Sequence, residues 1–135
     1  MSIRVEGAVT LLQVYDMPAS LSFYRDKLGF NVKGMAPNQT DDCDWALLEL
    51  SGVELMLNTA YERSDRPDSP DPQRLKHHQD TTIYFGCPDV IVAYQQIRAN
   101  RIECGEPYKT QYGYMALEIF DPDGYRLCFH WPLRE

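Results

Sequence analysis

The 135-residue sequence predicts an α+β fold in which the order strand, helix and three strands occurs twice. The first observation is the run from Asp121 to Trp131, where an Asp-Pro-Asp-Gly turn leads into a strand of alternating polar and apolar side chains. The second is a polar tract without hydrophobic period, Tyr61 to Gln79, which divides the chain near its middle. The third is that the segments on either side of this tract show the same order of elements.

The first half begins with an apolar strand, Val9 to Val14. Asp16 is placed to cap the next helix, in which Leu21 and Leu28 belong to one apolar stripe and Gly29 ends the helix in the left-handed conformation. Three strands are predicted after the helix: Phe30 to Met35, Trp45 to Leu50 and Val53 to Leu57, the last two forming a hairpin around Ser51-Gly52.

The second half begins with a strand, Thr81 to Phe85, and Pro88 opens a helix whose apolar stripe includes Val90 and Ile97. Asn100 is the expected left-handed cap of this helix. The three strands that follow are predicted at Ile102 to Pro107, Tyr112 to Phe120 and Arg126 to Trp131, with the Asp-Pro-Asp-Gly turn joining the last two.

Matched spacings indicate that the second half duplicates the first. Asp16 lies seven residues after Val9, and Asp89 lies seven after Thr82. We therefore predict a single domain over residues 1–135, built from two βαβββ modules that form curved mixed sheets around a cleft. Module one covers about residues 7–58 and module two about 80–132, and the tract between them, about 59–79, is expected to be an irregular linker or lid that holds His77 and His78.

Composition restricts the partners. A formal net charge of −7 argues against binding to nucleic acid, which requires a basic surface, and against an anionic membrane surface. No apolar run approaches the roughly 18 residues of a membrane-spanning helix. The four cysteines show neither a zinc-like spacing nor a Cys-x-x-Cys pair, so we expect reduced thiols in a cytoplasmic protein.

Alternation predicts which side chains line the cleft. If a helix covers the apolar face of each sheet, the opposite faces hold a mixed polar and aromatic set typical of a small-molecule pocket. Its members are Gln13, Glu54, Met56, Asn58, Thr82, Tyr84, Arg126, Cys128 and His130, with Tyr114 and Glu118 on a strand whose facing the pattern leaves open. Aromatic residues near the cleft mouth, among them Tyr112 and Trp45, suit a planar or cationic ligand, and as a group they also fit a division between core, dimer contact and pocket.

Several of these residues have two interpretations. His130 fits both a structural histidine and a general base. Glu54 and Arg126 fit either a buried ion pair or an acid that awaits a substrate. Cys128, near Arg126, fits a packed thiol or a nucleophile of low pKa.

Two motifs resemble one superfamily. The segments DMPASLSFYRDKLGF (residues 16–30) and DPDGYRLCFHWP (residues 121–132) are similar to those of the vicinal oxygen chelate proteins, which include glyoxalase I, bleomycin-resistance proteins, fosfomycin-resistance enzymes and extradiol dioxygenases. The resemblance extends from about Ala8 to Pro132. It implies the glyoxalase/bleomycin resistance fold, and its bleomycin-resistance-like branch is the one this chain resembles in style.

The resemblance also implies where a metal would bind in the metal-dependent members. Carried onto this chain, the four ligand positions are Val9, Met56, Thr82 and Cys128. A valine has no donor atom and a thioether suits hard divalent ions poorly, so we predict no metal and no other cofactor.

We therefore expect a homodimeric protein that binds a small molecule in a metal-free cleft and sequesters it. The alternative is a lyase, isomerase or dioxygenase of the glyoxalase type with a relocated or metal-free active site, in which Glu54 and His130 are candidate acid and base. A third possibility is a subunit whose cleft is vestigial. The sequence leaves open whether the protein is an enzyme.

Overall fold

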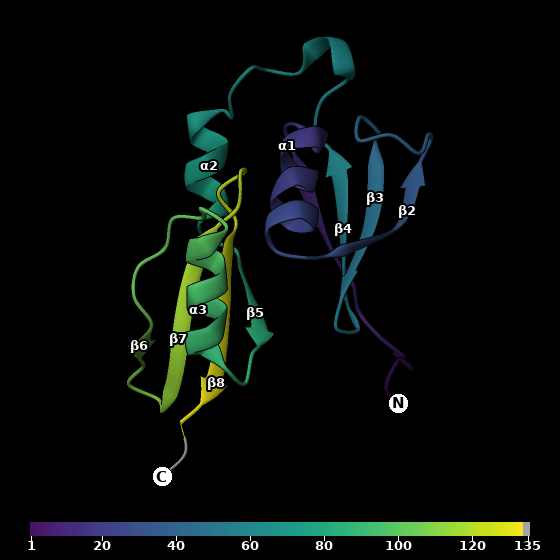
Figure 1. Ribbon diagram of the computed structural model, residues 1–135. Helices are drawn as coiled ribbons and strands as arrows, with labels where there is room; N and C mark the ends of the chain where they lie inside the picture. Colours follow the sequence, from purple (N-terminus) through teal and green to yellow (C-terminus); the bar gives the residue numbers. More distant parts are fainter. Residues whose placement is uncertain (134–135) are drawn as a thin grey trace. The chain divides into compact units, whose positions relative to one another are not determined.

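The computed structural model describes residues 1–133, which fold into two compact units, the first covering residues 1–66 and the second beginning at Pro67. Each unit contains one four-stranded mixed sheet with helices packed against it (Figure 1). The α+β class and the repeated element order are confirmed. No helix among these residues is long and apolar enough to cross a membrane.

The first unit has the strand order β1-β4-β3-β2. The strands are β1 (Thr10–Val14), β2 (Asn31–Ala36), β3 (Trp45–Leu50) and β4 (Val53–Thr59), and β1 is parallel to β4 whereas the other pairs are antiparallel. The hairpin between β3 and β4 turns at Ser51 and Gly52, both with positive φ, as expected for a two-residue turn.

One helical segment covers the apolar face of the first sheet. It begins as α1 (Met17–Leu21), which contacts β4, and continues as a π-helix (Ser22–Lys27); Leu21 and Tyr24 of this segment are completely buried. Gly29 follows at φ +92, which confirms the predicted left-handed end. Asp16 stands at the N-cap but its side chain makes no capping hydrogen bond, so the predicted cap is wrong in that respect.

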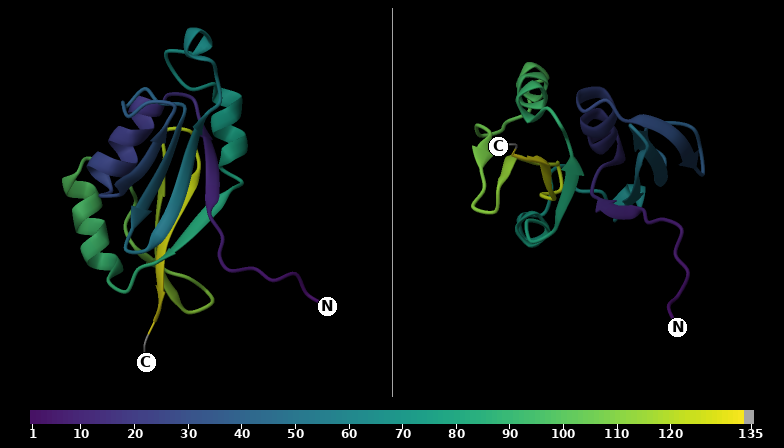
Figure 2. Two further views of the ribbon diagram at one scale, coloured as in Figure 1. Left: turned by 90° about the vertical axis from the view of Figure 1, so that its right-hand side faces the viewer. Right: turned by 90° about the horizontal axis from the view of Figure 1, so that it is seen from below.

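The second unit has the strand order β5-β8-β7-β6. Its elements are α2 (Pro72–His78), β5 (Thr82–Gly86), α3 (Val90–Ala99), β6 (Tyr108–Lys109), β7 (Tyr114–Phe120) and β8 (Arg126–Pro132). Strand β5 is parallel to β8, and α3 packs on β7 and β8. The right panel of Figure 2 shows α3 on one side of this sheet, and Figure 1 shows α2 at the end of the sheet where β7 turns into β8.

Three predictions about the second half are wrong. The strand expected at 102–107 lies at Tyr108–Lys109, because Pro107 has no N–H for a ladder. The left-handed residue after α3 is Arg101 (φ 62), whereas Asn100 has φ −90. The helix starts at Val90 and not at Pro88.

The polar tract is also more ordered than we expected. It contains a 3₁₀ turn (η2, Arg63–Asp65) and helix α2, which Asp71 caps by accepting a hydrogen bond from the Gln73 N–H at 2.9 Å. Asp71 and Pro72 form a typical helix start, an N-cap residue followed by proline at N1. The helix was not predicted because the tract has no hydrophobic period.

Helix α2 packs on the turn between β7 and β8. The turn has the predicted hydrogen bond from the Gly124 N–H to the Asp121 carbonyl (3.0 Å), and Asp121 Oδ1 also accepts from the Asp123 and Tyr125 N–H groups. His78 lies in α2 with its Nδ1 2.7 Å from the Asp123 carbonyl and its ring stacked on Tyr125 at 4.0 Å. The helix therefore braces the turn from which β8 begins.

The duplication is visible in the strand register. In the first unit Leu11 lies opposite Met56, and in the second Tyr84 lies opposite Cys128. These pairs occupy the same rung of the parallel ladder, two residues past Val9 and Thr82, the positions that indicated the repeat. The two sheets are thus built on one register.

Candidate functional site: the uncovered faces of the two sheets

In the first unit, the helix-free face of the sheet holds the predicted side chains. Leu12, Val14, Leu55 and Leu57 are buried, so the alternate residues Gln13, Glu54, Met56 and Asn58 share the other face. Asn58 Nδ2 lies 3.4 Å from Gln13 Oε1. The predicted alternation of β1 and β4 is confirmed.

Glu54 has a partner that the pattern did not show. Lys33 Nζ lies 3.0 Å from Glu54 Oε2, because a β-bulge between Val32 and Gly34 places an additional residue in β2 opposite β3. Glu54 also lines a hollow of about 570 Å³ whose other walls include Val9 and Gly52. The carboxylate is therefore paired within its own unit and lies at a concave surface.

In the second unit, the register places a polar and aromatic set on the face opposite α3. Thr82, Tyr84, Tyr114, Glu118, Arg126, Cys128 and His130 share this face, which resolves the facing of the strand that carries Tyr114 and Glu118. Tyr108 and Phe120 also lie on it. Sequence reasoning missed Tyr108 because the pattern places the strand too early in the chain, although the spacing of Tyr108 from Tyr114 indicated a hairpin partner.

An aromatic cluster occupies the end of this face near His130. The imidazole stacks on Tyr114 at 4.7 Å between ring centres and meets Tyr84 at 4.8 Å, and Tyr112 lies 5.6 Å from Tyr114. Tyr84 is 55% exposed, and the nearby Tyr112 hydroxyl raises the pKa of Tyr84. We call Tyr84, Tyr112, Tyr114 and His130 the aromatic cluster.

His130 contributes an unused polar atom to this cluster. Its Nδ1 is buried and has no hydrogen-bond partner among residues 1–133. A buried ring nitrogen without a partner is uncommon in folded proteins. A group that donates or accepts a hydrogen bond at this nitrogen would supply the missing partner.

Glu118 is the centre of a second group on the same face. The Tyr108 hydroxyl donates to Glu118 Oε1, and Arg126 Nε lies 3.5 Å from Oε2. The hydrogen bond to the carboxylate raises the pKa of Tyr108. Arg126 thus pairs within its own unit, and its guanidinium also lies 5.7 Å from the Phe120 ring centre.

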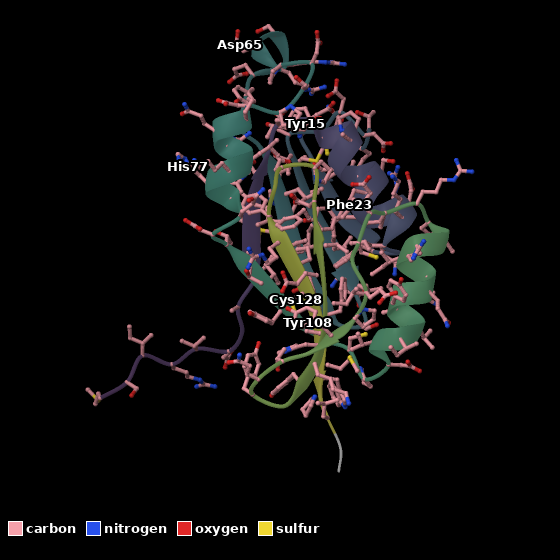
Figure 3. All side chains as sticks on the ribbon, turned by 90° about the vertical axis from the view of Figure 1, so that its left-hand side faces the viewer. Tyr15, Phe23, Asp65, His77, Tyr108 and Cys128 are labelled. Atoms are coloured by element: carbon pink, nitrogen blue, oxygen red, sulfur yellow. The ribbon has the colours of Figure 1, made fainter. Side chains whose placement is uncertain are left out.

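Cys128 is a buried thiol and not an activated one. The residue is 2% exposed, and burial, followed by the Glu118 carboxylate, raises its pKa above the ordinary value. The interpretation of Cys128 as a nucleophile of low pKa is therefore wrong. Figure 3 labels Cys128 and Tyr108 on the sheet of this unit.

The four positions that the resemblance assigns to a metal do not fit one. Val9 has no donor atom, Met56 offers a thioether, and Cys128 is held in its protonated form by burial. Thr82 alone cannot hold a divalent ion. Within either unit, no three His, Cys, Asp or Glu side chains of residues 1–133 come together as metal ligands do.

The paired βαβββ units, each with a helix on one face of its sheet and mixed side chains on the other, define a protein of the glyoxalase and bleomycin-resistance type. The chain belongs to the Glyoxalase/Bleomycin resistance protein/Dioxygenase superfamily, whose family model matches residues 8–129. A search of curated protein sequences found no significant match.

Solved structures of the same fold are distant in sequence. A glyoxalase/bleomycin resistance protein/dioxygenase from Nocardioides is 20% identical with a TM-score of 0.72, over 99% of this chain and 87% of that one. A bleomycin-binding protein complexed with bleomycin is 18% identical with a TM-score of 0.70, over 97% and 100%. TnmS3, an antibiotic binding protein from Streptomyces sp. CB03234, is 15% identical with a TM-score of 0.70, over 97% and 99%.

Proposed function

We propose that this protein binds a planar, cationic small molecule on the uncovered sheet faces and sequesters it without a metal. The aromatic cluster carries the proposal, because it combines an exposed ring, Tyr84, with a stacked imidazole whose Nδ1 lacks a partner. Aromatic faces attract planar rings and cations, and a net charge of −7 favours a cationic ligand. The bleomycin-binding and antibiotic-binding structures described above make bleomycin a reasonable first probe.

The ligand-binding set remains the predicted one. It comprises Gln13, Glu54, Met56, Asn58, Thr82, Tyr84, Tyr114, Arg126, Cys128 and His130, to which we add Tyr108, Tyr112 and Glu118 from the contacts above. We propose that Tyr84 and His130 contact the ligand directly. Cys128 contributes shape, because its thiol is buried.

A metal-free lyase or isomerase is the second candidate. One observation favours it: the imidazole of His130, on the face opposite α3, has a ring nitrogen without a hydrogen-bond partner among residues 1–133, which makes it the candidate base. Glu54, which lies beside Lys33 in the first unit, is the other candidate for acid or base in this function. Product formation from a bound candidate ligand separates this function from sequestration, and a failure to bind any ligand would support a vestigial site.

Binding should depend on the exposed ring. We expect Tyr84→Ala to weaken the binding of proflavine, a planar cation, by roughly threefold to tenfold, because one stacking surface is lost. Fluorescence titration measures this directly. The matched control is Val92→Ala, which removes an exposed apolar side chain from α3 on the other side of the sheet. Equal affinities for the two variants would contradict the assignment of the aromatic cluster.

Purified protein should contain no stoichiometric divalent metal, since the four family ligand positions supply no suitable donor set. Elemental analysis after purification without chelator is the measurement. One zinc, nickel, manganese or iron per chain, lost in Glu54→Ala or His130→Ala, would show that a relocated metal site exists.

We also propose a cytoplasmic homodimer that binds neither nucleic acid nor membranes. Each sheet ends in an edge strand, and exposed edges are commonly covered by association. Sedimentation at micromolar concentration should show a dimer, and a monomer alone under those conditions would refute it.

A further inference from the structure

A groove of about 670 Å³ lies in the second unit, beside the end of α3. Its walls include Arg98, Arg101, Glu103, Cys104, Glu118 and Phe120. The groove exists because β6 pairs only with Met115 and Ala116, so the chain after α3 runs past the rest of β7 without joining the ladder. It shares no residue with the aromatic cluster, although Glu118 belongs both to the groove and to the ligand-binding set proposed above.

Arg101 is held in this groove at a backbone conformation that usually belongs to glycine. Its φ is 62, and it occupies the position after the C-cap of α3 in a Schellman motif: the Arg101 N–H donates to the Arg98 carbonyl (3.0 Å) and the Ile102 N–H to the Ile97 carbonyl (3.1 Å). A side chain with a Cβ is crowded there. A strained residue that persists at the wall of a groove is a reason to look for a function.

The charges in the groove are only partly paired. Arg101 and Glu103 flank the buried Ile102, and among residues 1–133 no hydrogen bond or ion pair engages the side chain of either one. Arg98 donates to the Tyr94 hydroxyl at 2.8 Å, which orients its guanidinium and leaves other N–H groups available. The groove thus presents two guanidinium groups and one carboxylate that lacks a partner.

An apolar wall lies next to these charges. Phe120 is 46% exposed, although it is a large aromatic residue at the end of a strand. Glu118, the other β7 residue of the groove, is already engaged by Tyr108 and Arg126. Its charge is therefore balanced within the protein, and Glu103 is the carboxylate left for a ligand.

We propose that this groove binds a free α-amino acid with an aromatic or apolar side chain. The ligand carboxylate pairs with Arg101 and Arg98, whose planar guanidinium groups suit a carboxylate. The ligand ammonium pairs with Glu103, and the side chain packs on Phe120. Arg101 and Glu103 line the same groove, so a ligand that carries both charges can meet both residues.

The native Cys104 makes the proposal measurable. It lines the groove and is partly exposed, whereas Cys43 and Cys128 are buried and Cys87, which is partly exposed, is no part of the groove. L-Phenylalanine should slow the alkylation of Cys104 by iodoacetamide and leave that of Cys87 unchanged, as read by peptide mass spectrometry. The apparent dissociation constant follows from the dependence of the rate on phenylalanine concentration.

Two analogues test the two charges. 3-Phenylpropanoate lacks the ammonium and 2-phenylethylamine lacks the carboxylate, and each should bind roughly fivefold to tenfold more weakly than phenylalanine, as expected for the loss of one charged contact. If 3-phenylpropanoate protects Cys104 as well as phenylalanine does, the assignment to an amino acid is wrong. If none of the three protects it, the groove is no binding site for this class.

Two variants test the residues. Arg101→Gly should abolish the protection by phenylalanine while raising the melting temperature by roughly 2–8 °C, because glycine adopts the left-handed conformation without strain. Glu103→Gln should weaken phenylalanine binding and leave 3-phenylpropanoate binding unchanged. Tyr84→Ala should change the binding of neither phenylalanine nor 3-phenylpropanoate. A failure of the amino-acid proposal is thereby distinguished from a failure of the ligand site proposed at the aromatic cluster. Wild-type protection in Arg101→Gly would overturn the proposal.

Discussion

Gly124→Ala is expected to destabilise the protein by about 2–5 kcal/mol, although it adds only one methyl group. Two costs combine at this position. Gly124 has φ +88, and a Cβ built on it would lie 2.5 Å from the Leu75 carbonyl oxygen and 2.9 Å from the Leu75 Cα. Both atoms belong to the backbone of α2, so no side-chain rotation relieves the contact. Urea denaturation followed by circular dichroism measures the change.

The chain contains a matched control for this substitution. Gly113 also has φ +88, but nothing lies within 4 Å of the position that a Cβ would take there, so Gly113→Ala carries the conformational cost alone. The difference between the two variants, about 1–3 kcal/mol, isolates the packing of α2 on the turn. If the two variants unfold at the same urea concentration, α2 does not pack on Gly124 in solution.

Leu127→Ala is expected to cost about 2–5 kcal/mol, whereas His130→Ala should cost less than about 1 kcal/mol. Leu127 is completely buried between α3 and the sheet, and its truncation leaves a cavity. His130 lies three residues further on the opposite, uncovered face and is only partly buried. Phe129→Ala should fall between the two, because Phe129 is partly exposed and stacks on Phe85 at 5.3 Å.

Arg126→Ala completes this series. Its partner Glu118 is about one-third exposed and keeps its hydrogen bond from Tyr108, so we expect a loss of less than about 1 kcal/mol. The larger penalty that a buried Glu54–Arg126 pair would carry does not apply to the pairing seen here. Melting and ligand titration on all four variants are decisive: a stable Leu127→Ala and an unfolded His130→Ala would mean that the two faces are reversed.

Local chemistry explains what sequence reasoning predicted well. The Asp-Pro-Asp-Gly turn, the left-handed Gly29 and the alternation of β4 and β8 each depend on residues adjacent in the chain, so the pattern alone defines them. The uncovered faces follow from the same alternation. The internal duplication is seen in the parallel strand pairs of the two sheets, which have the same register.

The errors arise where distant residues decide the local structure. Helix α2 is short and has no hydrophobic period, and it contacts the turn through Arg74, Leu75 and His78. Lys33 reaches Glu54 only because of a bulge in β2, which no pattern in the sequence indicates. The pairing of Tyr108 with Glu118 depends on where β6 joins β7. Because the sequence places this strand a few residues too early, it does not predict the pairing.

The shared register of the two sheets has a consequence for redesign. Leu11 and Met56 occupy the rung that Tyr84 and Cys128 occupy in the other unit, on equivalent backbone. The parallel ladders of the two halves therefore offer equivalent positions for an exchange of side chains. A Leu11→Tyr exchange would place a second copy of the Tyr84 ring on the first sheet, and so offers a route to altered ligand preference.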